Sequence, residues 1–302
     1  MPTLRNYLSL IRFSHTIFAM PFAGIGFAMG WQQYHLRQQN PLRGEALHLD
    51  GQAWLIKLVL VVSCMVFART AAMAFNRYLD RHFDARNPRT AIREIPSGII
   101  AADQVLWFTA INALLFLGCS YLINPLCFML APVALLVILG YSYTKRFTAL
   151  CHLILGLGLS LAPLGAYLAI TARFSLLPVL ISLAVIGWVS GFDIIYALQD
   201  EAFDREQKLH SIPAMLGKKK ALAVSRLLHG VSVVAVLATG YWGAFGGLYW
   251  LGAVVFTGML IYQQSIVSPD DLRKVNLAFM TANGIASVVF AAFVVTDIVF
   301  FH

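Results

Sequence analysis

AWLIKLVLVVSCMVFARTAAMAFNRYLDRHFD, residues 53–84, joins a long apolar run to a short acidic cluster. A second apolar segment ends in the same way, in DIIYALQDEAFD, residues 193–204. The two clusters concentrate the acidic residues of a chain that has only 14 of them. Ionised groups at the end of a membrane segment are costly to hold together unless something positive joins them. Two such clusters therefore indicate a divalent-metal site for a phosphorylated ligand.

The composition is that of an integral membrane protein. Of the 302 residues, 59% are hydrophobic and 12% are charged, whereas soluble domains carry about 25% charged residues. Apolar runs long enough to cross about 30 Å of hydrocarbon as helices recur along the chain, and the alternating pattern of an outer-membrane barrel is absent. The sequence therefore predicts an all-α, polytopic membrane protein with nine transmembrane spans, at 11–34, 53–79, 101–122, 125–142, 149–171, 175–199, 221–242, 246–264 and 275–299.

No linker or low-complexity run divides the chain, so residues 1–302 are expected to form a single transmembrane domain. The first span has no small-residue cleavage site after a short core, which favours a retained helix over a signal peptide. The fold is thus expected to be one bundle in the lipid bilayer.

Lysines and arginines gather on one side of the predicted topology. With a cytoplasmic N-terminus, most of them fall on the cytoplasmic side, and the opposite side receives only Arg37, Arg43, Lys57 and Arg173. The positive-inside rule then places the N-terminus and both acidic clusters in the cytoplasm. The net charge of +8 reflects this orientation and not a nucleic-acid partner. We expect a multi-pass protein of the inner, cytoplasmic membrane.

The first cluster places Asn76, Asp80 and Asp84 four residues apart. Positions four apart on a helix advance about 40° around its axis, so these side chains form a shallow stripe on one face and can converge on one ligand. Hard oxygen donors match Mg²⁺, which takes one or two carboxylates and completes its shell with water and phosphate oxygens. We therefore expect the phosphorylated ligand to be a diphosphate.

The second cluster places Asp193, Asp200 and Asp204 at positions i, i+7 and i+11. On one continuous helix these lie within about 40° of one another, with Tyr196 beside them. An alternative is that both clusters are ordinary interface charges paired with adjacent arginines. Two regular stripes in a chain with 14 acidic residues make that alternative less attractive.

Basic residues near the clusters are candidates for anion binding. Tyr141, Lys145 and Arg146 lie where the fourth span leaves the bilayer, and they suit phosphate oxygens or an ordinary interface anchor. Arg69 lies deeper in the second span, where an unpaired guanidinium costs at least ~2.5 kcal/mol. It should meet an internal carboxylate, a diphosphate oxygen or the carboxylate of an acidic substrate. Arg12 is a candidate for the same role or for an interfacial charge.

Together these motifs resemble the UbiA superfamily of intramembrane prenyltransferases. The first cluster fits its NxxxDxxxD signature, the second its DxxYxxxDxxxD signature, and Tyr141 with Lys145 its YxxxK element, in order within residues 12–213. Arg77 is a departure, because many members carry aspartate after the asparagine. The resemblance implies a helical bundle around a central cavity, capped on the cytoplasmic side, that binds a polyprenyl diphosphate through Mg²⁺.

The resemblance also implies a role for each motif residue. The implied metal ligands are Asn76, Asp80, Asp84, Asp200 and Asp204. The implied diphosphate-binding residues are Tyr141, Lys145 and Arg146. Asp193 and Tyr196 are implied to act in catalysis, by orienting the acceptor or stabilising positive charge, and Asp193 is also a candidate to accept the ring proton.

The acceptor implied by the resemblance is an aromatic acid. The second cluster, continued through residue 213, is most similar to the branch of 4-hydroxybenzoate polyprenyltransferases and futalosine-pathway menaquinone prenyltransferases. Arg69 and Arg12 suit a carboxylated ring, so we expect 4-hydroxybenzoate or a hydroxynaphthoate, in ubiquinone or menaquinone biosynthesis. One alternative is a UbiA-type enzyme with another acceptor. The other is a cation-coupled carrier, whose site would lie near mid-bilayer between broken helices.

Overall fold

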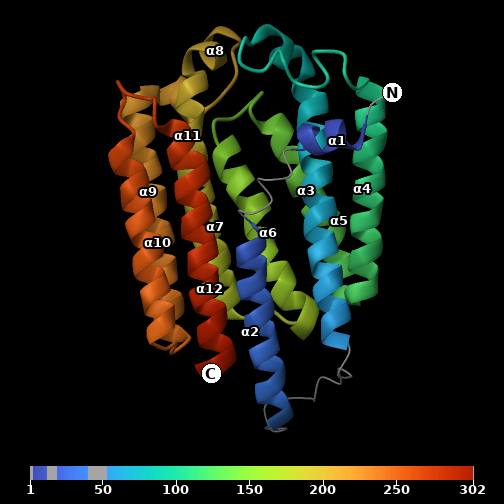
Figure 1. The fold of residues 1–302 in the computed structure, drawn as a ribbon, viewed down its shortest axis with the longest axis vertical. Coiled ribbons are helices and arrows are strands. Elements are labelled where there is room, and N and C mark those ends of the chain that lie inside the picture. Colours follow the sequence, from blue (N-terminus) through green and yellow to red (C-terminus); the bar gives the residue numbers. More distant parts are fainter. Residues whose placement is uncertain (1–2, 12–18, 40–52, 302) are drawn as a thin grey trace.

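A computed structural model describes residues 3–11, 19–39 and 53–301, and every regular element in these ranges is a helix (Figure 1). The elements are α1 Leu4–Leu10, α2 Met20–Gln39, α3 Ala53–Arg86, α4 Ala102–Ile123, α5 Pro125–Thr144, α6 Cys151–Thr171, α7 Leu176–Ala197, η3 Leu198–Asp200, α8 Glu201–Glu206, α9 Ile212–Trp242, α10 Gly247–Ile266, α11 Val275–Leu277, the π-helical turn η4 Ala278–Ala282 and α12 Asn283–Phe301. The prediction of an all-α protein is confirmed.

Seven segments within these ranges are long and apolar enough to cross a membrane. They are α3, α4, α5, α6, the α7–α8 segment Leu176–Glu206, α9 and the segment Val275–Phe301. The helices α2 and α10 have 20 residues each and are not among these seven segments, so the count of nine spans stays a prediction. Large apolar side chains such as Leu114, Leu136 and Val254 are exposed on the outside of the bundle, as expected of a surface that faces lipid.

Two helix boundaries differ from the predicted spans in a way that shapes the site. The helix α3 continues to Arg86, seven residues beyond the predicted end at Leu79. The segment α9 begins at Ile212, where Ser211 accepts a hydrogen bond from the Ala214 backbone N–H and caps it. It is kinked at Gly217, whose φ of 75° and ψ of 162° are not helical, so the continuous helix starts just after Gly217, close to the predicted start at Ala221. The helix α3 therefore extends past the apolar run that reveals it in the sequence, and α9 is preceded by a short capped turn.

The helices pack side by side, with four clusters of buried apolar side chains between them. One centres on Trp188, which contacts the rings of Phe22, Phe192 and Phe256. The helix α2 lies directly against α6, where a Cβ on Gly26 would clash with the Pro163 carbonyl group. The absence of a side chain at that glycine permits the close approach.

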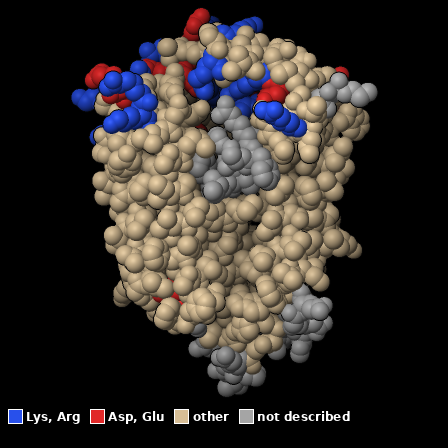
Figure 2. Space-filling model, in the orientation of Figure 1, with Lys and Arg blue, Asp and Glu red and all other residues tan. Residues whose placement is uncertain are grey.

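Charged residues gather at one end of the bundle. Figure 2 shows most of the lysines, arginines and acidic residues on that view at the end that holds α8 and the segment 87–101, while the flanks are apolar. The C-terminus lies toward the opposite end (Figure 1). The residues of a functional site are therefore expected at the charged end.

Candidate active site

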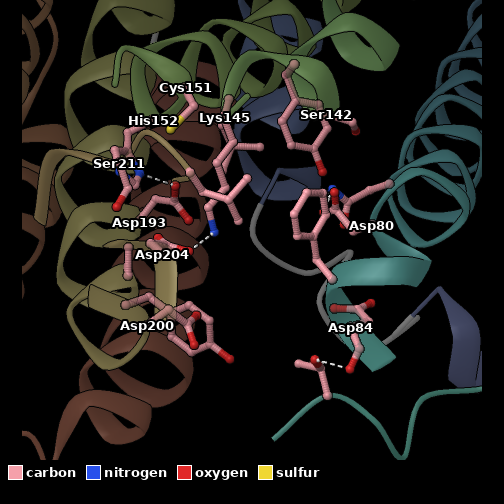
Figure 3. A pocket seen from close by; sticks show the side chains of 18 of the residues that line it. Asp80, Asp84, Ser142, Lys145, Cys151, His152, Asp193, Asp200, Asp204 and Ser211 are labelled. Carbon is pink, nitrogen blue, oxygen red and sulfur yellow. Dashed lines mark hydrogen bonds and ion pairs between the residues drawn. The ribbon is translucent and has the colours of Figure 1, made fainter. Parts of the chain in front are cut away.

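A cavity of about 310 Å³ opens between α3, α5, α6 and α7 at the charged end. We call it the polar chamber. The carboxylates and the lysine that line it are Asp80, Asp84, Lys145, Asp193, Asp200 and Asp204. In Figure 3 the side chains of the first cluster face those of the second across this space. The two acidic clusters, more than 100 residues apart in sequence, thus belong to one site.

The first cluster lies on the unbroken C-terminal part of α3. Asn76 donates a hydrogen bond from Nδ2 to Asp80 Oδ2 at 3.1 Å. Arg93, from the segment after α3, donates to both oxygens of Asp84 at 2.6 and 2.8 Å. Asp80 Oδ1 is 3.9 Å from Arg146 Nη2, and its side chain is 29% exposed. The first cluster therefore keeps one weakly paired carboxylate open to the chamber.

The second cluster does not lie on one continuous helix, so that prediction is wrong. The helix α7 ends at Ala197, the 3₁₀ turn η3 follows, and α8 starts at Glu201. The ion pairs of Arg89 with Asp200 and of Lys145 with Asp204 offset the backbone hydrogen bonds lost where the helix is interrupted. Acidic residues also suit the first turn of α8, because the N-terminal end of a helix dipole is positive. Asp193, Asp200 and Asp204 nevertheless all line the chamber.

Each carboxylate of the second cluster has a basic partner from another element. Lys145 Nζ lies 2.7 Å from Asp204 Oδ1, and the Asp204 side chain is fully buried. Arg89 donates from Nη2 to both oxygens of Asp200, at 2.9 and 2.6 Å, and from Nη1 to the Tyr196 hydroxyl at 3.2 Å.

These pairings keep the two cations charged. Burial is the largest single influence on the pKa of Lys145 and acts to lower it, but Asp204, together with Asp200 and Asp80, raises this pKa overall. Burial also acts to lower the pKa of Arg89, but Asp200 and Tyr196 together raise this pKa overall. Both side chains therefore offer fixed positive charge at the chamber wall.

Asp193 is paired with a histidine. Its Oδ2 lies 2.6 Å from His152 Nδ1, and both residues line the polar chamber (Figure 3). His152 Nε2 in turn accepts the backbone N–H of Ile212 at 3.4 Å. The carboxylate proposed to act in catalysis is thus held from α6.

A second cavity, of about 340 Å³, continues from the first between α3, α4, α5 and α6. We call it the apolar chamber, because its walls are almost entirely hydrocarbon, with residues such as Val61, Phe116, Leu130, Ile138 and Leu161. The residues that line both cavities are Arg69, Met73, Tyr141, Leu155 and Leu159. A charged and an apolar compartment therefore meet at one junction.

Arg69 lies at that junction, and its guanidinium group is not fully hydrogen-bonded within the described residues. Its Nε atom is buried and has no hydrogen-bond partner among the described residues. A buried charged donor left unpaired is costly. The arrangement therefore favours an anionic ligand at the boundary between the two chambers, close to Tyr141.

One predicted basic residue, Arg146, does not line the polar chamber. Arg146 donates to the Leu79 carbonyl oxygen at 2.9 Å, and its guanidinium lies over the rings of Phe83 and Tyr143. Its contact with a diphosphate stays a prediction. Arg12 lies outside the described residues.

Arg77, the departure from the family pattern, is 6% exposed. Its Nε donates to the Leu10 carbonyl oxygen at 3.5 Å and so links α3 to α1. The residue also contributes to the chamber lining. An arginine at this position thus binds the N-terminal helix.

Sequence reasoning missed three functional candidates, namely Arg89, Arg93 and His152. The two arginines belong to a basic, turn-rich segment that follows the first cluster and signals a loop near the site. No spacing rule pairs Arg89 with Asp200, 111 residues away. His152 lies in an apolar run beside Cys151, and both line the chamber, although an isolated cysteine in an apolar run is usually a core residue.

The donor set suits Mg²⁺. Within the described residues no three His, Cys, Asp or Glu side chains are grouped closely enough to hold a metal ion by themselves. Mg²⁺ does not need such a cage, since it is usually held by one or two carboxylates together with phosphates and water. Asp204 Oδ2 is buried and has no hydrogen-bond partner in the described structure, so this oxygen is available to bind a metal ion.

The family follows from a comparison over most of the chain. The model of the UbiA prenyltransferase family matches residues 42–287. The chain belongs to this family. It is therefore a prenyltransferase, and the alternative of a cation-coupled carrier is set aside.

Curated relatives of this UbiA-family chain carry an aromatic acceptor in their names. A 4-hydroxybenzoate octaprenyltransferase of Aeromonas hydrophila is 28% identical over 251 residues, which cover 82% of this chain and 86% of the relative. One of Paraburkholderia xenovorans is 30% identical over 242 residues, covering 80% and 84%.

Solved UbiA structures share the fold. The apo structure of a UbiA homologue from Aeropyrum pernix K1 has a TM-score of 0.80 and 28% identity, covering 94% of this chain and 98% of that one. A UbiA homologue from Archaeoglobus fulgidus bound to DMAPP and Mg²⁺ has a TM-score of 0.74 at 19% identity, covering 97% and 99%. The second likeness concerns the fold alone.

Proposed function

We propose that this UbiA-family enzyme transfers a polyprenyl group from a polyprenyl diphosphate to an aromatic acid, either 4-hydroxybenzoate or a hydroxynaphthoate, with Mg²⁺ as cofactor. The observation that carries the proposal is the junction of the two chambers at Arg69. A diphosphate with a hydrocarbon tail and an anionic aromatic ring need three environments in contact: charged, apolar and cationic. The polar chamber, the apolar chamber and Arg69 supply them in that order.

The diphosphate end is assigned to the polar chamber. Asn76, Asp80, Asp84, Asp200 and Asp204 would hold Mg²⁺, which when bound offsets the negative charge of the departing diphosphate. Lys145 lies among these residues and would bind phosphate oxygens directly. The ion pairs of Lys145, Arg89 and Arg93 with the carboxylates support this role, because the same cations are placed to bind phosphate oxygens.

The tail is assigned to the apolar chamber. A prenyl chain that starts at the diphosphate passes the junction beside Tyr141 and enters walls of hydrocarbon. Exclusion of water there protects the allylic cation formed when the carbon–oxygen bond to diphosphate ionises. The acceptor ring then forms the new carbon–carbon bond and loses a proton, which we assign to Asp193.

The acceptor carboxylate is assigned to Arg69. Its unpartnered Nε supports an anionic ligand at this depth. A benzoate and a naphthoate present the same carboxylate, so the acceptor could belong to ubiquinone or to menaquinone biosynthesis. The names of the curated relatives favour 4-hydroxybenzoate.

The membrane topology is assigned from charge. The charged end of the bundle (Figure 2) would lie in the cytoplasm, with the segments around the polar chamber forming a cap and with the N-terminus on the same side. Residues 1–302 would act as one transmembrane domain in the inner membrane.

The direct test uses purified protein in detergent with Mg²⁺ and a polyprenyl diphosphate. 4-Hydroxybenzoate, dihydroxynaphthoate isomers and the corresponding rings without a carboxylate are supplied in parallel, and prenylated product is read by mass spectrometry. We expect prenylated product from one carboxylated acceptor, and we expect its formation to stop when Mg²⁺ is chelated. Folded protein that prenylates only the rings without a carboxylate would overturn the aromatic-acid assignment.

A further inference from the structure

His152 joins three elements at the wall of the polar chamber. It is the second residue of α6 and is 3% exposed. Its imidazole contacts Asp193 on α7 through Nδ1, at 2.6 Å, and Ile212 at the start of α9 through Nε2, at 3.4 Å. No part of the function proposed above assigns a role to this histidine.

The hydrogen bonds define which nitrogen carries the proton. A backbone N–H only donates, so the Ile212 N–H requires His152 Nε2 to be an acceptor. A neutral imidazole with Nε2 unprotonated carries its hydrogen on Nδ1. That hydrogen can only be donated to Asp193 Oδ2. The first backbone N–H of α9 thereby gains a partner that its own helix cannot supply.

The histidine is itself held from several sides. Ser190 Oγ donates to the His152 carbonyl oxygen at 3.1 Å. Ser211 caps α9 and so fixes the direction of the Ile212 N–H. The neighbouring Cys151 Sγ donates to the His210 carbonyl oxygen at 3.5 Å. The imidazole therefore has little freedom to turn away from Asp193.

Asp193 stays accessible from the other side. Its side chain is 24% exposed, whereas that of His152 is 4% exposed. In Figure 3 His152 approaches the carboxylate from the chamber wall. One carboxylate oxygen is thus bound by the imidazole, and the other is left to face the substrates.

We infer that His152 is a positioning residue, which fixes the orientation of the Asp193 carboxylate so that its free oxygen can take the proton released by the acceptor ring. The inference rests on the proposed function. In that step the ring carbon bonds to the prenyl carbon, the prenyl carbon–oxygen bond to diphosphate breaks, and the ring hydrogen passes as a proton to Asp193 Oδ1. Diphosphate leaves with the electron pair of the broken bond, and Asp193 later returns the proton to water.

The test compares two variants that differ in one hydrogen bond. His152→Leu keeps an apolar side chain of similar volume but cannot donate to Asp193, whereas His152→Gln keeps an N–H donor. We expect kcat to fall about 10- to 100-fold in His152→Leu, the range for lost orienting partners, with KM for prenyl diphosphate within twofold of the wild type. His152→Gln should recover most of kcat.

His229→Leu is the matched control. His229 is buried to a similar degree, at 4% exposure, contacts Gln264, packs against Gly191 of α7 and lines neither chamber. It should keep wild-type kcat. Equal kcat in His152→Leu and wild type, or a His152→Gln variant as slow as His152→Leu while folded, would overturn the positioning role.

A readout independent of turnover separates this inference from the proposed function. Nitrogen-15 NMR of labelled histidine should show one buried ring protonated at Nδ1, with a proton signal that disappears in Asp193→Leu. A proton on Nε2 of His152 would overturn the inference even in an active enzyme. If the wild type prenylates no aromatic acid, the proposed function fails, and the NMR result alone then decides whether His152 orients Asp193.

Discussion

The two chambers have similar volumes, about 310 and 340 Å³, and opposite linings. The polar chamber is built from side chains that stand out in an apolar sequence, such as Asp80 and Lys145. The apolar chamber is built from residues such as Leu130 and Gly165, which no pattern separates from those that face lipid. In this membrane enzyme, charged residues therefore identify the polar chamber in the sequence, whereas the residues of the apolar chamber cannot be told apart from those that face lipid.

The largest expected effect comes from removing a carboxylate from the polar chamber. Asp80→Ala should lower kcat by about 10²–10³-fold, the usual cost of losing a group that stabilises transition-state charge. Because Asp80 is 29% exposed and lies 3.9 Å from Arg146, the free energy of unfolding should change by less than about 1 kcal/mol. Steady-state kinetics and thermal unfolding in detergent measure the two effects.

Asp103→Ala is the control for Asp80→Ala. Asp103 is an exposed acidic residue in the first turn of α4 and does not line the polar chamber. It should keep full activity. Full activity in Asp80→Ala as well would remove this residue from the metal site.

The next test asks whether charge in the polar chamber also supports the fold. Lys145→Leu leaves the fully buried Asp204 without its cation, so the free energy of unfolding should fall by about 3 kcal/mol. The double variant Lys145→Leu/Asp204→Leu should recover most of that stability and stay inactive. Unfolding in detergent compares the three proteins, and unchanged stability in Lys145→Leu would show that Asp204 finds another partner.

A third variant acts at the junction of the two chambers. Arg69→Leu should raise KM for the aromatic acid about 10- to 100-fold, the range for a lost hydrogen bond to a charged group. KM for prenyl diphosphate should stay within about threefold of the wild type. Initial rates at varied acceptor concentration measure the effect, and a ring without a carboxylate, if it reacts, should show no change. An equal rise for both substrates would assign Arg69 to the diphosphate instead.

The smallest expected effect concerns the apolar chamber alone. Gly165 lines it, and a Cβ there meets nothing within 4 Å. Gly165→Leu should therefore fill part of the cavity without strain and raise KM for a long polyprenyl diphosphate about tenfold, with little change for dimethylallyl diphosphate. Gly118→Leu, equally open but exposed on the outside of α4, is the matched control. Equal effects on long and short donors would place the tail elsewhere.

Local sequence accounts for the all-α fold, most of the helix positions and the first acidic cluster. Apolar length specifies a helix in lipid because every backbone hydrogen bond must be made within the segment. Spacing by four places Asn76, Asp80 and Asp84 on one face wherever the helix is unbroken, and α3 is unbroken as far as Arg86.

The rest of the site depends on packing between helices. The pairing of His152 with Asp193 joins residues 41 positions apart, and that of Arg89 with Asp200 joins residues 111 positions apart. The break between α7 and α8 lies where tertiary ion pairs hold Asp200 and Asp204. The apolar chamber likewise depends on how four helices stand apart from one another. The physical reason is the same in each case: helical periodicity fixes neighbours within about two turns, whereas these contacts depend on packing between helices.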